Sequence, residues 1–307
     1  MMKKELVCSL LAGCSLCATA AEKVVESKIL PKVYLWQDSS IRTHVDRPSI
    51  TPMLVNSSEA RPAVLVIPGG GYGSVCESTE GSPIGKKFNE LGYHAFVLDY
   101  RTGTGVWPRP QLDAMRAMKM IRCNAKKWNV NPDRVYVCGF SAGGHLAASL
   151  GTICAELDAA ASDECDKFPH RPDAMILCYG VLVFEDWSHI GTQRNLLGDD
   201  FKKVRHNCST EKFVNADTPP AFLMHTINDQ TVNYRNSIVF AEAMAKAQVP
   251  CELALYNWGD HGMLLGKNTE VGAWPLQAYA FLETLEKSKL DPGFRERYTN
   301  KYQAGQL

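Results

Sequence analysis

The sequence predicts an α/β fold in which a mostly parallel central sheet is flanked by helices on both faces. Short β-rich runs alternate along the chain with segments of helical periodicity, which is the pattern of parallel strands joined by crossover connections. The runs are apolar almost throughout, as strands covered on both faces must be. No repeat, Gly/Ser-rich linker or charge block divides the chain. We therefore expect a single domain over residues 21–287 and a polar tail over residues 288–307.

The expected strands begin with an antiparallel edge and continue into the parallel part of the sheet. Lys32–Trp36 and Ser49–Val55 form a hairpin-like region near the N-terminus and predict the edge strands. The runs that follow are rich in β-branched and aromatic residues. They predict the remaining strands, at Ala63–Ile67, His94–Asp99, Arg134–Gly139, Ala174–Tyr179, Ala221–His225 and Glu252–Tyr256.

Three segments between these runs have apolar residues spaced by three and four positions, which is the period of an amphipathic helix. The longest is Gln111–Trp128, and another is Ser237–Ala247. The third follows Ser141 and includes Leu146 and Leu150. We expect crossover helices at these places.

The composition limits the class of partner. The 307 residues include 33 Lys and Arg against 33 Asp and Glu, a balance that argues against a nucleic-acid-binding surface and against an acidic disordered chain. No run of about 18 or more apolar residues occurs outside the extreme N-terminus, so no membrane span is expected. We expect a soluble globular protein whose partner is a small or neutral molecule. The oligomeric state does not follow from the sequence.

The first 20 residues have the pattern of an export signal. Lys3 and Lys4 precede the uncharged, mostly apolar stretch Leu6–Cys17, and Ala18-Thr19-Ala20 supplies the small residues of a cleavage site. We therefore expect a signal peptide over residues 1–20 and a periplasmic or secreted protein. Two other interpretations stay open. Leu11-Ala12-Gly13-Cys14 resembles a lipoprotein processing box in which Cys14 would be lipidated, or the segment is not cleaved at all.

Eight of the eleven cysteines lie beyond residue 20, an even number that permits disulfides in an exported protein. Cys138 and Cys178 lie inside apolar strand runs, where a free thiol behaves as a small hydrophobic group. Cys154 and Cys165 bracket a polar loop and are the pair that we expect to be bridged. None of the eight has the C-x-x-C spacing of a zinc or redox site, so we expect no metal.

The segment Gly139-Phe140-Ser141-Ala142-Gly143 fits the pattern G-x-S-x-G and lies between an apolar strand run and a helical segment. In this context the glycines permit a sharp strand-to-helix turn that exposes the hydroxyl of Ser141 above the sheet. The N-terminus of the following helix brings backbone N–H groups and a positive dipole end to the same point. Ser141 is therefore a candidate nucleophile. The alternative is a glycine-rich turn whose serine is incidental.

A second glycine-rich segment, Pro68–Tyr72, follows the strand that ends at Ile67. Its glycines let the backbone approach a ligand closely. The amides of Gly70 and Gly71, with that of Ala142, are candidates for an oxyanion hole, in which each donor stabilises the transition state by about 3 kcal/mol. The alternative is a plain tight turn. A phosphate-binding loop is not expected, because no Gly-Lys-Ser/Thr ending follows.

The candidate acid and base follow the last two expected strands. Asp229 comes just after Ala221–His225, where a carboxylate is placed to orient a histidine, although it is also a candidate helix N-cap. His261, after Glu252–Tyr256, is the candidate general base. We assign no catalytic role to Asp260, because side chains adjacent in sequence usually point in different directions. The order Ser, Asp, His differs from the chymotrypsin and subtilisin orders and is that of a third hydrolase class.

These motifs together resemble the bacterial α/β-hydrolases related to bifunctional acetylxylan and feruloyl esterases, within the broader hormone-sensitive-lipase-like group. The resemblance extends over residues 62–287. The matching stretches are PGGGY (Pro68–Tyr72), FVLDYR (Phe96–Arg101), NPDRVYVCGFSAGGHLAA (Asn131–Ala148), DTPPAFLMHTIND (Asp217–Asp229), NSIVFAEAM (Asn236–Met244) and GDHG (Gly259–Gly262).

The resemblance implies an α/β-hydrolase fold and a serine hydrolase without a cofactor. It implies a catalytic triad of Ser141, Asp229 and His261. It also implies a set of oxyanion donors, namely Gly70, Gly71 and Ala142. Two departures stand out. Pro68 replaces the histidine of the H-G-G-G motif of many lipase-like relatives, and Gln230–Asn233 lacks the proline that is common in this loop.

By resemblance, we expect an exported serine carboxylesterase that removes acetyl or similar short acyl groups from carbohydrates such as xylo-oligosaccharides through an acyl-enzyme. Tyr72, Trp107 and Trp187 are candidate substrate contacts, and Trp258 and Trp274 also lie in or near expected loops. The alternative for these aromatic residues is packing in the core. Three other functions stay open: a general short-chain esterase or lactonase, an amidase or peptidase with the same triad, and a non-catalytic binding protein.

Overall fold

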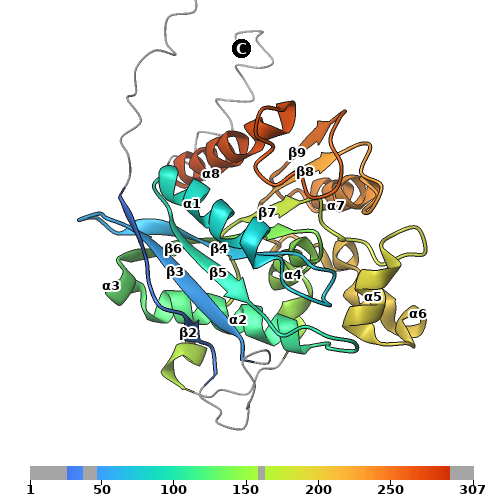
Figure 1. Ribbon diagram of the computed structural model, residues 1–307, viewed down its shortest axis with the longest axis horizontal. Coiled ribbons are helices and arrows are strands. Elements are labelled where there is room, and N and C mark those ends of the chain that lie inside the picture. Colours follow the sequence, from blue (N-terminus) through green and yellow to red (C-terminus); the bar gives the residue numbers. More distant parts are fainter. Residues whose placement is uncertain (1–25, 37–46, 158–162, 291–307) are drawn as a thin grey trace, which may run out of the picture.

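The computed structural model describes residues 26–36, 47–157 and 163–290. At its centre is a sheet with the strand order β1-β3-β5-β4-β6-β7-β8-β9, in which β2 also pairs with β3. Helices lie on both sides of this sheet (Figure 1), so the predicted α/β architecture is confirmed. The predicted signal peptide over residues 1–20, the alternative lipidation of Cys14 and most of the predicted tail lie outside the described residues.

The parallel strands are those that the sequence predicts. Neighbouring strands in the order β5-β4-β6-β7-β8-β9 pair in parallel. Their bounds are β4 (Arg61–Ile67), β5 (His94–Asp99), β6 (Val130–Phe140), β7 (Met175–Cys178), β8 (Ala221–Thr226) and β9 (Cys251–Tyr256).

The edge of the sheet is antiparallel, as the sequence also predicts. β3 (Ser49–Val55) pairs antiparallel with β5 and with β2 (Val33–Tyr34). A further edge strand, β1 (Ser27–Ile29), pairs with β3 as well. This strand is not predicted, because three exposed residues are too few to display a pattern of alternation.

Successive residues of β4 face opposite layers of the core. Ala63 and Leu65 belong to one hydrophobic cluster, whereas Val64 and Val66 belong to another. All four are fully buried. Because side chains alternate across a strand, a sheet covered on both faces requires apolar residues at every position. This requirement explains the continuous apolar runs in the sequence.

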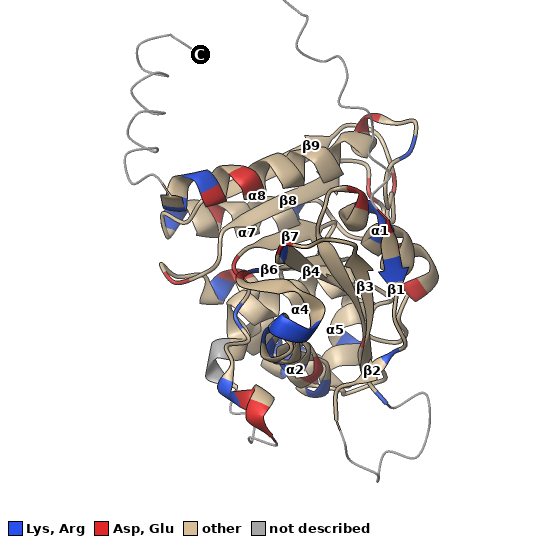
Figure 2. Ribbon diagram, turned by 90° about the vertical axis from the view of Figure 1, so that its left-hand side faces the viewer, with Lys and Arg blue, Asp and Glu red and all other residues tan. Residues whose placement is uncertain are grey.

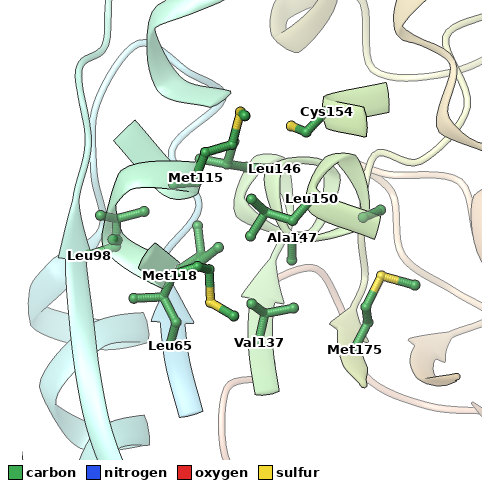
Figure 3. Close-up of a cluster of buried hydrophobic side chains, with 14 of the residues drawn as sticks. Leu65, Leu98, Met115, Met118, Val137, Leu146, Ala147, Leu150, Cys154 and Met175 are labelled. Carbon is green, nitrogen blue, oxygen red and sulfur yellow. The ribbon is translucent and has the colours of Figure 1, made fainter. Parts of the chain in front are cut away.

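Each face of the sheet has its own helices. α1 (Ser82–Glu90) and α8 (Trp274–Leu290) cover one face, where Phe88 and Phe281 join the same cluster. The opposite face is covered by α2 (Arg109–Cys123), α3 (Ala125–Trp128), α4 (Ala142–Gly151) and α7 (Arg235–Lys246). Figure 3 shows part of this second layer, in which Met118 and Ala147 lie over Leu65 and Val137.

Some helix bounds differ from the prediction. The helix expected over Gln111–Trp128 is divided at Asn124, whose side-chain amide donates to the Met120 carbonyl at 2.9 Å. Asparagine competes in this way with the backbone and favours helix ends. α8 continues to Leu290, three residues past the predicted end of the domain at residue 287. The short helices α5 (Ile190–Leu197) and α6 (Phe201–Val204) are not predicted.

The predicted Cys154–Cys165 disulfide is wrong, because Cys165 is bonded to Cys123. Cys123 is the last residue of α2, and Cys165 lies in the short turn Glu164–Lys167, which packs beside that helix end. An ion pair between Arg116 and Asp163 holds the turn against α2. Cys154 is instead a free, buried thiol (Figure 3), and Cys138 and Cys178 are free and buried as expected.

Charged residues of both signs are interspersed over the helices and loops of the described ranges (Figure 2). This distribution agrees with the equal numbers of basic and acidic residues in the sequence. Within the same ranges, none of the helices combines the length and the apolar composition that a bilayer span requires.

Candidate active site

The predicted catalytic residues meet at one edge of the sheet. Ser141 follows the last residue of β6, Asp229 lies shortly after β8, and His261 lies in the loop after β9. Because these strands are parallel, their carboxyl ends meet at the same edge, where ligands of open α/β sheets bind. The topology thus brings together three residues that are far apart in the sequence.

Ser141 lies in a sharp turn between β6 and α4. Its φ and ψ are 53° and −119°, a conformation that is rare for a residue with a side chain. The flanking glycines leave the space that the turn needs. A Cβ atom on Gly139 would lie 2.2 Å from the carbonyl oxygen of Gly143, and one on Gly143 would lie 2.2 Å from that of Ile67. The predicted strand–turn–helix geometry is therefore present.

His261 connects Ser141 to Asp229. Its Nε2 atom lies 2.9 Å from the Oγ of Ser141, and its Nδ1 atom lies 2.8 Å from the Oδ2 of Asp229. With Nδ1–H donating to the carboxylate, Nε2 is free to accept the proton of the serine hydroxyl. This arrangement can generate a serine nucleophile and then donate the same proton to a leaving group.

The carboxylate of Asp229 is held from several sides. Its Oδ1 accepts from the backbone N–H groups of Thr231 and Val232, both at 2.8 Å. Its Oδ2 faces His261 and also lies 3.3 Å from the Nε2 of His225. Burial alone would raise the pKa of Asp229, but the hydrogen bonds with His225 and His261 outweigh it and hold the pKa below its usual range. The group is therefore a carboxylate when His261 becomes charged.

Two sequence-based alternatives for this loop can be resolved. The alternative role of Asp229 as a helix N-cap is wrong, because α7 begins only at Arg235 and Tyr234 is its N-cap. Asp260, which we assigned no catalytic role, accepts from the backbone N–H of His261 at 2.7 Å and contacts that of Gln230 at 3.4 Å. Its carboxylate thus holds the two loops together.

The glycine segment lies directly beside the nucleophile. A Cβ atom on Gly69 would lie 2.9 Å from the Cβ of Ser141. Gly70 and Gly71 have φ values of 123° and 61°, which glycine adopts without strain. In the described part of the chain, no hydrogen bond is formed by the N–H groups of Gly70, Gly71 or Ala142. These amides are therefore available to a ligand at Ser141.

Residues that the sequence does not single out complete the surroundings of His261. The ring of Tyr179 lies edge-to-face on the imidazole of His261, with centroids 5.0 Å apart. The Tyr179 hydroxyl donates to Glu80, whose other oxygen accepts from Gly69. Burial lowers the pKa of His189, and repulsion from a protonated His261 lowers it further. No local signal marks Glu80, because glutamate in a polar segment predicts an exposed position.

The three candidate substrate contacts lie in different environments. The prediction that Tyr72 contacts the substrate is wrong. Its ring is fully buried and its hydroxyl lies 2.8 Å from the Nδ1 of His145, so it has no exposed surface to offer a substrate. Trp107 lines a cavity of about 290 Å³ together with Leu197 and Asn207. Trp187 is partly buried, with the Arg235 guanidinium 4.7 Å from its ring centroid.

The two remaining tryptophans of the predicted loops differ in exposure. Trp258 is 74% exposed, whereas Trp274 is fully buried and its Nε1–H donates to the Leu264 carbonyl at 2.7 Å. For Trp274, the alternative of core packing is therefore correct. Over residues 26–36, 47–157 and 163–290, no cluster of three or more His, Cys, Asp or Glu side chains is arranged to hold a metal ion.

Comparison with known proteins gives consistent matches. The family model BD-FAE matches residues 53–244. The chain is 31% identical over 259 residues to endo-1,4-beta-xylanase B of Butyrivibrio fibrisolvens, covering 82% of this chain and 40% of that protein. It is 33% identical over 210 residues to the acetylxylan esterase of Xylanibacter ruminicola, covering 66% of this chain and 41% of that protein. The chain thus spans about two fifths of the length of these curated relatives.

Among solved structures, the chain is similar to the acetyl ester-xyloside bifunctional hydrolase from Caldicellulosiruptor lactoaceticus. The two are 35% identical, with a TM-score of 0.78, over 83% of this chain and 96% of that one. The similarity therefore extends over nearly the whole of that chain.

Proposed function

Because the chain belongs to the BD-FAE family and has the α/β-hydrolase fold, we propose that it is a carboxylic ester hydrolase with Ser141 as its nucleophile. The observation that carries this proposal is the continuous hydrogen-bonded line from Ser141 through His261 to Asp229. Such a line is the requirement for activating a serine hydroxyl by general base catalysis.

In the proposed reaction, the Oγ of Ser141 attacks the ester carbonyl carbon while the Nε2 of His261 takes the hydroxyl proton. The carbonyl oxygen becomes an oxyanion that the amides of Gly70, Gly71 and Ala142 stabilise. The imidazolium, stabilised by Asp229, then donates its proton to the departing alcohol, and an acyl-enzyme remains. Water repeats the sequence and releases the carboxylic acid and the free serine.

For the substrate, we propose an acetylated carbohydrate such as an acetylated xylo-oligosaccharide. The names of the similar proteins support this class, since they include a xylanase, an acetylxylan esterase and an acetyl ester-xyloside hydrolase. We propose that Trp107, which lines a cavity, and Trp187 offer flat rings to the sugar, since aromatic rings present a large rigid apolar surface. We also propose that the chain is exported, because residues 1–20 have the composition of a signal peptide.

Acetate release from acetylated xylan tests the proposed function. The panel also includes feruloylated arabinoxylan, short nitrophenyl esters, lactones and peptide amides, each assayed with the wild type and with Ser141→Ala. We expect acetate release from the glycan by the wild type alone. Activity confined to nitrophenyl esters or lactones would favour a general esterase, cleavage of amides a peptidase or amidase, and inactivity on the whole panel a binding protein.

A further inference from the structure

Glu80 is a buried carboxylic acid that the proposed reaction does not use. It lies in the π-helical turn Glu77–Gly81, between β4 and α1, and is only 6% exposed. Burial raises the pKa of its carboxyl group, an effect that hydrogen bonds with Gly69 and Tyr179 oppose. A buried acidic group is unfavourable unless its oxygens have hydrogen-bond partners. The partners of Glu80 therefore indicate what its side chain does.

One oxygen of Glu80 binds the glycine segment Pro68–Tyr72. Its Oε2 accepts from the backbone N–H of Gly69 at 2.6 Å. The carbonyl oxygen of Gly69 in turn accepts from the N–H of Cys76 at 3.0 Å, and the Cys76 carbonyl accepts from the N–H of Glu80 at 2.9 Å. Gly69 is thus fixed on both sides, and the adjoining residue is Gly70, a proposed oxyanion donor.

The other oxygen of Glu80 is connected to the general base through Tyr179. Its Oε1 accepts from the hydroxyl of Tyr179 at 2.9 Å. The Tyr179 ring is set edge-to-face against the imidazole of His261, at an interplanar angle of 70°. Tyr179 therefore contacts the ring of the general base directly.

We propose that Glu80 is a positioning residue whose single carboxylate fixes the glycine segment Pro68–Tyr72 relative to His261. This inference rests on the ester hydrolysis proposed above. Both of its partners are donors, which matches an acceptor-only carboxylate. The oxyanion donors stabilise the negative charge on the carbonyl oxygen while the general base takes the serine proton, so both must be correctly placed around the same reacting ester.

The test compares Glu80→Gln with Glu77→Gln, a control from the same turn whose side chain is partly exposed. Glutamine keeps the size of Glu80 but has one acceptor oxygen, so one of the two donors loses its partner. For hydrolysis of 4-nitrophenyl acetate by Glu80→Gln, we expect kcat to fall about 10- to 100-fold while KM changes less than about threefold. Tyr179→Phe removes only the hydroxyl, and we expect kcat to fall about 3- to 10-fold. Glu77→Gln should behave as the wild type.

Inhibition by phenylboronic acid separates positioning from mere stabilisation of the fold. The boronate forms a tetrahedral adduct on a reactive serine, so its affinity depends on the oxyanion donors and not on a leaving group. We expect its inhibition constant to rise in Glu80→Gln by about the factor by which kcat falls. A purely structural role would lower Tm and leave kcat per folded molecule and the inhibition constant unchanged.

The outcomes distinguish this inference from the proposed function. An active wild type with Glu80→Gln and Tyr179→Phe within about twofold of it, in kcat and in boronate affinity, would overturn the role of Glu80 alone. If Glu80→Gln does not fold, the kcat and boronate affinity of Tyr179→Phe decide the question. An inactive wild type would overturn the ester hydrolysis and the role of Glu80 with it.

Discussion

Ser141 and His261 are 120 residues apart in the sequence, yet the Nε2 of His261 lies 2.9 Å from the Oγ of Ser141. This contact places the proton acceptor of His261 directly beside the hydroxyl of Ser141, which is the path that proton transfer requires. Three segments are arranged around this contact. They are the turn that carries Ser141, the loop that carries Asp229 and the glycine segment Pro68–Tyr72.

Asp229→Asn should reduce kcat for 4-nitrophenyl acetate by about 10⁴-fold while the protein stays folded. The asparagine oxygen can still accept from Thr231 and Val232, but its amino group would face the Nδ1 of His261. The histidine would then carry its proton on Nε2 and could not accept the proton of Ser141. Asp260→Asn is the matched control, because an asparagine oxygen can still accept from the backbone N–H groups of His261 and Gln230. Its activity should equal that of the wild type. Equal losses in the two variants would contradict the assignment.

Removing the Cys123–Cys165 disulfide should destabilise the protein without affecting catalysis. The bond closes a loop with a sequence separation of 42 residues, and restriction of the unfolded chain by such a loop corresponds to about 4 kcal/mol. We expect the double variant Cys123→Ala/Cys165→Ala to lose about this free energy of unfolding in urea, with kcat unchanged. Cys251→Ala, which removes a free, half-buried thiol, should lose less than about 1 kcal/mol. The same small loss in both variants would argue against the bond.

His145 should make stability depend on pH. Burial lowers the pKa of His145 to about 4, whereas the unfolded chain retains the usual value of about 6.5. As the pH falls between these values, only the unfolded state takes up the proton, so its free energy drops and stability decreases. From about pH 7 to about pH 5, this one group should remove about 2 kcal/mol of the free energy of unfolding.

Urea unfolding at the two pH values measures this effect. His145→Gln should lose about 2 kcal/mol less than the wild type over the interval. His206→Gln, which replaces an exposed histidine, should keep the wild-type dependence. If His145→Gln keeps it too, His145 is not the group responsible.

Trp107→Ala should weaken the binding of a glycan without affecting a small ester. The ring lines a cavity of about 290 Å³, and stacking of a sugar on an aromatic ring contributes about 1 kcal/mol or more. We expect KM for acetylated xylo-oligosaccharide to rise about fivefold or more, with KM for 4-nitrophenyl acetate unchanged. Phe168→Ala, an exposed aromatic residue in another part of the surface, should change neither. An unchanged KM for the glycan in Trp107→Ala would remove Trp107 from the substrate site.

The parallel strands could be predicted because their signal is local. A strand buried on both faces has apolar residues at almost every position, and β4, β5, β7 and β8 carry this pattern within their own few residues. The grouping of the candidate catalytic residues could also be predicted, since topology brings the ends of parallel strands together. Ser141, Asp229 and His261 each follow such an end.

The contacts that could not be predicted depend on how distant segments dock. Cys165 pairs with Cys123 because the turn that carries it packs on α2 and is held there by Arg116, a fact that residue spacing does not contain. Tyr72 looked available in a glycine-rich loop, but its ring enters the core and meets His145. Glu80 carries no local signal of its role, since its partner Tyr179 is 99 residues away in the sequence.

The most direct test of the account is the rate of 4-nitrophenyl acetate hydrolysis by Ser141→Ala relative to the wild type. Removing the hydroxyl leaves the turn, His261 and Asp229 in place but removes the nucleophile. We predict that kcat/KM falls by about 10⁴-fold or more, with Tm and near-ultraviolet circular dichroism showing an intact fold. A folded Ser141→Ala protein with the full wild-type rate would contradict the assignment of Ser141 as the nucleophile.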